Sequence, residues 1–118
     1  SAAVLRYNKP VIVMETSTGY TLPEDLTPKA MEGVKSAQRA GYPATPQGQV
    51  QLISDLSDVM NAVPQGKGLG LFWWEPAWLP LPGQGWRTGA RRSAEQTLFD
   101  AQGQALPSLD AFRALVPH

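Results

Sequence analysis

The sequence predicts an α/β fold, because two short apolar runs of strand length are separated by one long amphipathic helix. The runs cover residues 11–16 and 68–75, and the helix between them covers residues 46–63. A strand, a helix and a second strand in this order predict parallel strands joined by a right-handed crossover. A last helix over residues 107–116 completes a βαβα unit. Two strands cannot cover their own faces and edges, so the unit is predicted to be a piece of a larger sheet or barrel.

The first apolar run is predicted to be a strand buried on both faces, because it opens with four consecutive apolar residues, 11–14. Residues 2–8 before it resemble the end of a helix. Side chains alternate along a strand, so Glu15 is expected on the face of Val11 and Val13. An acid that continues an inward row is unusual, because burial of a charge is costly.

The helix over residues 46–63 has the clearest pattern. Thr45 is predicted to cap it, and Pro46 to be its first residue. Its apolar residues follow helical spacing and predict one buried stripe: Val50, Ile53, Leu56, Val59, Met60 and Val63. A shorter helix is predicted over residues 27–39, inside the long segment 17–44.

The composition excludes several classes of function. The chain has 118 residues and a formal net charge of zero, which gives no argument for binding to nucleic acid or to a membrane surface. No apolar stretch is long enough to span a bilayer. There is no cysteine, which excludes disulfides and thiolate chemistry. The only histidine is the terminal His118, which argues against histidine triads and histidine-bound metals.

Glu15 is the main candidate for chemistry. It stands at the C-terminal end of a predicted strand, which is the end at which α/β barrels place their active sites. A carboxylate there can act as a nucleophile or as a general acid or base. It can equally be a solvated acid where the strand reaches the surface, and the spacing alone favours neither interpretation.

Aromatic residues gather around a second acid at the end of the second strand. Trp73, Trp74 and Trp78 surround Glu75. Because neighbouring side chains in a strand point to opposite faces, at most one of Trp73 and Trp74 faces a site, and the other packs under a helix. Core packing is the simpler explanation for each tryptophan alone, whereas the cluster as a whole suggests a platform on which a sugar ring stacks.

Two other patterns indicate structure more than function. Gly66, Gly68 and Gly70 precede a strand, whereas a phosphate-binding loop follows one, so nucleotide binding is rejected. Gly68 and Gly70 are instead interpreted as room inside a crowded barrel. Asp100 lacks the repeated acids of a calcium loop, and a polar turn before the last helix is the preferred interpretation.

Four blocks of sequence resemble the arabinogalactan endo-β-1,4-galactanases, glycoside hydrolase family 53. They occur in the order of the family and cover nearly the whole chain: residues 9–17, 42–49, 66–78, and 98–100 with 105–109. The resemblance implies a (β/α)8 barrel of retaining glycosidases. It also implies that residues 1–118 form the C-terminal part of this domain, with strand seven at 11–16, helix seven at 46–63, strand eight at 68–75 and helix eight at 107–116.

The same resemblance assigns roles to individual residues. Glu15 would be the catalytic nucleophile, and Trp74 would lie beneath the sugar at the point of cleavage. Trp78, Glu75 and Thr16 would contribute to the substrate groove. The implied substrate is β-1,4-galactan or arabinogalactan, no cofactor is required, and the parent enzyme would be secreted or periplasmic.

The chain also departs from the family. The acid/base glutamate of strand four and strands one to six have no counterpart in it. Bacterial members can join the loops corresponding to 17–44 and 76–97 with calcium, but no clear ligand set is present. The alternative is therefore an inactive fragment, a barrel-assembly piece or a weak galactan-binding remnant. Such a piece would pair with the remainder of the barrel or with copies of itself.

Overall fold

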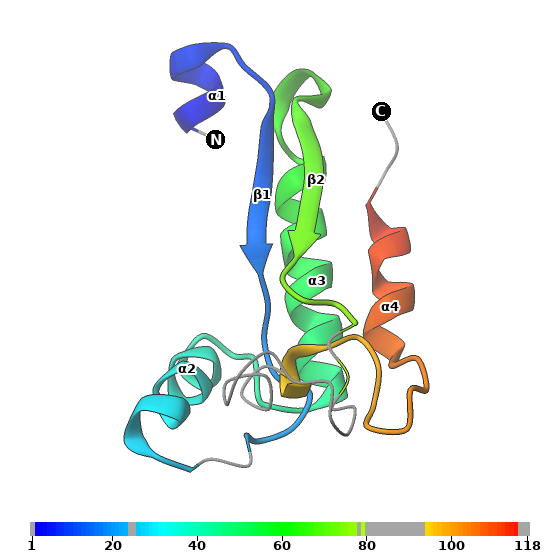
Figure 1. Ribbon diagram of the computed structural model, residues 1–118. Helices are drawn as coiled ribbons and strands as arrows, with labels where there is room; N and C mark the ends of the chain where they lie inside the picture. The colour runs from blue at the N-terminus through cyan, green and yellow to red at the C-terminus, as the bar shows by residue number, and fades with distance from the viewer. Residues whose placement is uncertain (1, 24–25, 78, 80–93, 116–118) are drawn as a thin grey trace.

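The computed structural model describes residues 2–23, 26–77, 79 and 94–115. Two parallel strands form a two-stranded sheet, and α3 packs against β2 (Figure 1). The helix α2 and the short 3-10 turn η3 lie near the end of the sheet to which both strands point. The elements in chain order are α1 (Ala2–Tyr7), β1 (Val11–Thr16), α2 (Pro28–Arg39), α3 (Pro46–Asn61), η1 (Pro64–Gly66), β2 (Gly68–Trp73), η3 (Ala94–Gln96), α4 (Pro107–Ala111) and η4 (Phe112–Ala114).

The predicted elements are all present, but several end earlier than the sequence suggests. α3 ends at Asn61 and not at residue 63, since Val63 precedes a proline and is extended. β2 ends at Trp73 and not at residue 75, since Glu75 leaves the extended region with a φ of 52°. The helix predicted over 107–116 is divided into α4 and η4.

The start of α3 is formed as predicted. Thr45 is extended, and its Oγ1 accepts a hydrogen bond from the Gly48 backbone N–H at 3.0 Å, which satisfies one of the free amides of the first turn. Pro46 is the first helical residue. A Cβ at position 48 would lie 1.9 Å from the carbonyl oxygen of Pro43, so only glycine lets the preceding chain approach so closely.

The core lies between α3, β2 and α4. Ile53, Trp73 and Leu98 are buried together, and Phe112 meets Trp73 edge to face at a centroid distance of 6.3 Å. The predicted stripe of α3 is partly wrong, because Val59 is 61% exposed. The buried face of α3 instead includes two polar residues, and its members are Gly48, Gln49, Ile53, Ser57 and Met60.

The first apolar run predicts a strand that is buried on both faces. The structure contradicts this prediction, because large side chains of the sheet are exposed. Several large apolar side chains of the strands and of the residue after β2 are exposed, and together they form what we call the open face: Ile12, Met14, Leu69, Phe72 and Trp74. The interpretation of Gly68 as a small residue that leaves space inside a barrel is also wrong. A Cβ there would lie 2.0 Å from the carbonyl oxygen of Met60, so this glycine makes space for the end of α3.

Candidate active site

Glu15 lies at the C-terminal end of β1, one residue before the strand ends. The pairing register slips between Val13 and Thr16, which indicates a β-bulge. Met14 and Glu15 are consequently both exposed, whereas Val11 and Val13 are half-buried. Glu15 is predicted to share a face with Val11 and Val13, and it differs from both in being exposed next to the bulge.

Trp74 and Glu75 follow β2 directly, at the same end of the sheet as Glu15 (Figure 1). The backbone N–H of Trp74 donates to the carbonyl oxygen of Thr16 at 2.9 Å, which joins the two strand ends. Trp74 is 42% exposed, and Glu75 is half-buried. Four predicted site residues thus gather at one end of the sheet, and the fifth, Trp78, lies outside the described residues.

The two glutamates share an unusual backbone conformation. The φ angle is 55° at Glu15 and 52° at Glu75, in the left-handed region. This conformation costs a residue with a Cβ about 1–2 kcal/mol relative to the right-handed one. Strain of this kind collects at functional sites, where the surrounding fold must hold it in place. Asn8 and Gln65 also have a positive φ, so the conformation of Glu15 and Glu75 is consistent with a site at these strand ends but does not single it out.

Trp73 anchors the second strand from the opposite side. It is 8% exposed, it packs in the core, and its Nε1 donates to the carbonyl oxygen of Gln96 at 2.7 Å. The prediction that Trp73 and Trp74 serve opposite faces is confirmed by their exposure. Because Trp73 is held by both packing and a hydrogen bond, the exposed Trp74 follows a fixed backbone.

Gln49 is a positioning group that the sequence interpretation missed. This residue of α3 is fully buried, and its Nε2 donates to the carbonyl oxygens of Thr18 and Thr97, each at 3.0 Å. Its Oε1 accepts from the Ser108 hydroxyl at 2.8 Å. We call these four residues the Gln49 clamp. The available signal was a polar residue one turn before Ile53, on the buried face of α3.

The clamp fixes the segment that follows Glu15 against three other parts of the chain. Two further bonds act beside it: the Tyr20 N–H donates to the Glu95 carbonyl oxygen at 2.8 Å, and the Ser17 hydroxyl donates to Gln96 Oε1 at 3.0 Å. Burial, followed by the carboxylates of Asp100 and Glu95, raises the pKa of Tyr20, so its phenol keeps its proton at neutral pH. The hydrogen bonds of Thr18, Tyr20 and Ser17 therefore hold the segment that follows β1 in place.

Asp100 forms the predicted polar turn. Its Oδ1 accepts from the backbone N–H groups of Gln102 and Gln104, both at 2.9 Å. Within residues 2–23, 26–77, 79 and 94–115, no three acidic or histidine side chains gather as a metal site would require. None of the helices that the structure describes is long and apolar enough to cross a bilayer.

Comparison with known proteins decides the family. The family model described as glycosyl hydrolase family 53 matches residues 1–112. The chain belongs to glycosyl hydrolase family 53. Among solved structures of the family, the GH53 catalytic domain of Ignisphaera aggregans has a TM-score of 0.78 and 38% sequence identity. That match covers 95% of this chain and 32% of the other.

Curated relatives agree with the structural match. The endo-β-1,4-galactanase of Bacillus subtilis (strain 168) is 36% identical over 139 residues, which cover 91% of this chain and 32% of the relative. The arabinogalactan endo-β-1,4-galactanase of Humicola insolens is 34% identical, over 95% of this chain and 30% of the relative. The chain thus spans about a third of the length of these family 53 proteins, and its parallel strand pair with helices is consistent with part of a barrel.

Proposed function

We propose that this chain supplies the nucleophile-bearing end of an endo-acting, retaining β-1,4-galactanase. In this proposal residues 1–118 belong to one (β/α)8 barrel domain, with β1 and β2 as its strands seven and eight and α3 and α4 as the helices that follow them. The observation that carries the proposal is the position of Glu15, an exposed and strained acid at the C-terminal end of β1 in a family 53 chain.

The proposed reaction has two steps and needs two carboxyl groups. A carboxylate oxygen of Glu15 attacks the anomeric carbon, the glycosidic bond breaks, and a covalent glycosyl-enzyme forms while an acid protonates the leaving oxygen. Water then attacks that intermediate and releases the sugar with retained configuration. The second carboxyl group must lie about 5–5.5 Å from the first. We place this acid/base outside the chain and do not assign it to Glu75.

The other residues at this end would hold the substrate. Trp74 offers an exposed indole next to the end of β1, which suits stacking against the apolar face of a sugar ring. Thr16 and Glu75 carry polar groups that can bind sugar hydroxyls, and Trp78 is proposed to extend the groove. The chemistry uses carboxyl groups alone, so we propose that no cofactor is required; a calcium ion would need a ligand set that the described residues do not show. A secreted or periplasmic parent enzyme fits a polysaccharide substrate.

A second candidate function is a fragment without activity, which assembles with other protein or binds galactan weakly. The open face favours this candidate, because Met14, Leu69 and Phe72 are each more than half exposed. Such apolar surface promotes association, and so do the edges of the sheet, which has two strands in the part of the chain that the structure describes. The partner would be the remainder of a barrel or another copy of the chain.

A chimaera tests the nucleophile directly. In the Bacillus subtilis endo-β-1,4-galactanase, the matching third is replaced by this chain, and reducing-sugar release from β-1,4-galactan is measured. The chimaera is expected to be active, and Glu15→Gln is expected to lower kcat by about 10³-fold or more. Glu32→Gln, an exposed acid of α2, serves as the control. An active Glu15→Gln chimaera would refute the assignment.

The isolated chain separates the two candidate functions. We expect no reducing-sugar release from it, because the second carboxyl group is missing. Affinity electrophoresis in galactan gels then measures whether the isolated chain still binds the polymer. Binding slows migration of the chain, and Trp74→Ala should abolish this slowing. Hydrolysis by the 118-residue chain that Glu15→Gln abolishes would overturn the placement of the acid/base outside it.

A further inference from the structure

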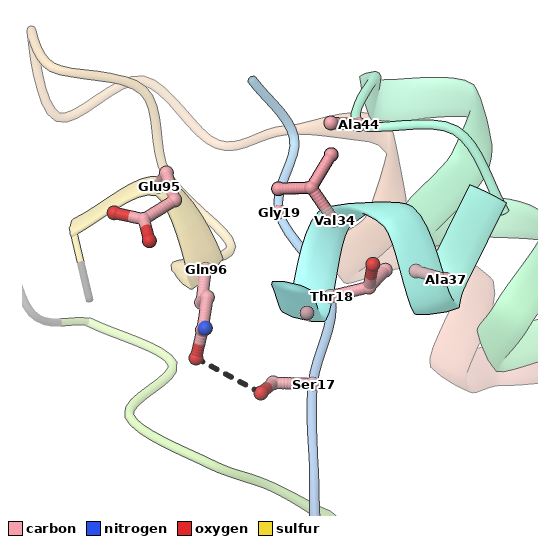
Figure 2. A pocket seen from close by; sticks show the side chains of 9 residues that line it. Ser17, Thr18, Gly19, Val34, Ala37, Ala44, Glu95 and Gln96 are labelled. Atoms are coloured by element: carbon pink, nitrogen blue, oxygen red, sulfur yellow. Dashed lines mark hydrogen bonds between the residues drawn. The ribbon is translucent and has the colours of Figure 1, made fainter. Parts of the chain in front are cut away.

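A third segment, residues 95–98, joins the ends of the two strands, and we call it the strap. On one side it contacts the chain that follows β1. The Ser17 hydroxyl donates to Gln96 Oε1 at 3.0 Å. The Tyr20 N–H donates to the Glu95 carbonyl oxygen at 2.8 Å. Figure 2, a view of the small pocket beside these contacts, shows the Gln96 side chain directed at Ser17.

The strap also holds the chain at the end of β2. The Trp73 Nε1 donates to the Gln96 carbonyl oxygen at 2.7 Å. The Leu98 N–H donates to the Pro76 carbonyl oxygen at 2.8 Å. These two bonds fix the backbone on either side of Trp74, from which the exposed indole projects. One segment of the chain thus contacts the ends of both strands.

Gln49 of α3 binds the strap and the chain after Glu15 with a single side chain. Its Nε2 donates to the carbonyl oxygens of Thr18 and Thr97, each at 3.0 Å, and its Oε1 accepts from the Ser108 hydroxyl at 2.8 Å. All four residues of the Gln49 clamp are at most 8% exposed. Hydrogen bonds that are shielded from water in this way are strong, and the loss of a partner is costly.

The amide group of Gln49 matches its three partners. An amide nitrogen offers two N–H donors and the amide oxygen accepts, whereas backbone carbonyl oxygens only accept. The two carbonyl oxygens and the Ser108 hydroxyl therefore determine which way the amide faces. A methionine side chain of similar length would fill the same space and form none of these bonds. The contribution of Gln49 is thus directional, and it can be separated from packing.

We propose that Gln49 is a positioning residue, which sets the place of the Glu15 carboxylate relative to the Trp74 indole. Because Gln49 is fully buried, it acts through the carbonyl oxygens of Thr18 and Thr97 and not by contact with a substrate. The inference rests on the proposed function, in which Glu15 attacks a sugar that stacks on Trp74. In such a reaction a displacement of about 1 Å can lower the rate about 10²-fold.

The chimaera with the Bacillus subtilis endo-β-1,4-galactanase tests the effect on the reaction. Gln49→Met should lower kcat by about 10–100-fold and change KM by less than about threefold, because Trp74 stays exposed. Met60→Ala is the matched control, since Met60 is a buried residue at the opposite end of α3, next to Gly68. It should lower the urea midpoint and leave kcat within about twofold of wild type.

Hydrogen exchange in the 118-residue chain tests the same role without activity. The Trp74 N–H donates to the Thr16 carbonyl oxygen at 2.9 Å, so its exchange reports whether the strand ends stay joined. In Gln49→Met this amide should exchange at least about tenfold faster relative to the amides in the middle of α3. In Met60→Ala the same ratio should be unchanged.

A milder variant serves if Gln49→Met does not fold. Ser108→Ala removes only the bond that orients the Gln49 amide and leaves both of its donors. It should change kcat and the Trp74 exchange ratio in the same direction, by about threefold.

The possible results separate the positioning role from the proposed function. Wild-type kcat in Gln49→Met, in a chimaera that Glu15→Gln inactivates, would overturn the positioning role and leave the proposed reaction standing. Equal losses of kcat in Gln49→Met and Met60→Ala would also overturn it, because stability alone would then explain both. An inactive wild-type chimaera would count against the proposed reaction. The Trp74 exchange ratio then decides: an increase in Gln49→Met supports the role of the clamp, and an unchanged ratio overturns it.

Discussion

The two faces of the sheet have opposite characters. On the helix face, Ile53, Trp73 and Leu98 are at most 8% exposed and pack under α3 and α4. On the open face, Ile12 and Met14 are 44% and 61% exposed. The helix face therefore supplies the stability of the chain, whereas the open face and its C-terminal end supply the groups proposed for chemistry. Substitutions on the two faces should separate these properties.

The largest contrast is expected between the two neighbouring tryptophans. Trp73→Ala removes a buried ring that packs on Phe112 and bonds to the Gln96 carbonyl, so the free energy of unfolding should fall by about 3–5 kcal/mol. Trp74→Ala removes an exposed ring and should cost less than about 1 kcal/mol. Urea unfolding followed by circular dichroism measures both values.

Equal losses for the two tryptophan variants would contradict the division between the faces. The galactan gel provides the complementary test, because Trp74→Ala should lose retardation while it remains folded. A Trp73→Phe variant keeps most of the core volume and should retain both stability and retardation better than Trp73→Ala.

The next largest effect is expected at the Gln49 clamp. Gln49→Leu leaves Thr18, Thr97 and Ser108 without the bonds that the buried amide supplies, so unfolding should become easier by about 2–4 kcal/mol. Gln51→Leu is the matched control. Its Nε2 bonds to Asp55 at the surface, and its removal should cost no more than about 0.5 kcal/mol.

Hydrogen exchange shows whether the clamp acts on the site as well as on stability. In Gln49→Leu, the amides of residues 17–20 should exchange faster than those in the middle of α3, because the variant frees the segment that follows Glu15. Uniformly faster exchange throughout the chain would mean that Gln49 contributes to stability alone.

Sequence patterns predicted those features that depend on near neighbours. Thr45 and Pro46 mark the start of α3 through a bond that spans three residues, and alternation alone placed Trp73 and Trp74 on opposite sides. The apolar run before Glu15 likewise predicted its position at the end of a strand.

Features that depend on distant partners were not predictable. The bulge that exposes Glu15 arises from the pairing of β1 with β2, more than fifty residues later. The partners of Gln49 are 31, 48 and 59 residues away, so no residue near Gln49 in the sequence predicts them. Exposure of Met14 reflects the small number of strands, which an apolar run cannot report.

A gain in stability is expected at the end of the open face. Glycine adopts a positive φ without the Cβ penalty, so Glu15→Gly should raise the free energy of unfolding by about 1 kcal/mol. Met14→Gly is the control, because Met14 has no positive φ and a strand glycine there should lower stability by about 0.5–1 kcal/mol. Urea unfolding of both variants measures the difference.

If glycine at position 15 makes the chain more stable, the chain keeps Glu15 despite a loss of stability, and this supports a function for the glutamate. A solvated acid without a function would provide nothing that offsets the lower stability. If Glu15→Gly proves less stable than wild type, the left-handed conformation is not strained in this setting, and the argument from strain for a site at Glu15 fails.

The smallest effect on stability is expected at the centre of the open face. Met14 is 61% exposed, so Met14→Lys should change the free energy of unfolding by no more than about 0.5 kcal/mol. The same substitution places a charge where a second protein surface would have to pack, so it should lower the apparent mass in concentration-dependent light scattering. Glu32→Lys, which changes an exposed residue of α2, should leave that mass unchanged.

Light scattering thereby decides what the open face is for. If the wild-type chain associates and Met14→Lys separates it, the face is an interface, as expected for one side of an incomplete barrel. If the wild type is monomeric at every concentration, the exposed apolar side chains are tolerated in water, and the assembly alternative loses the observation that favours it. The assignment of Glu15 would be unaffected, because it rests on the strand end and not on the face.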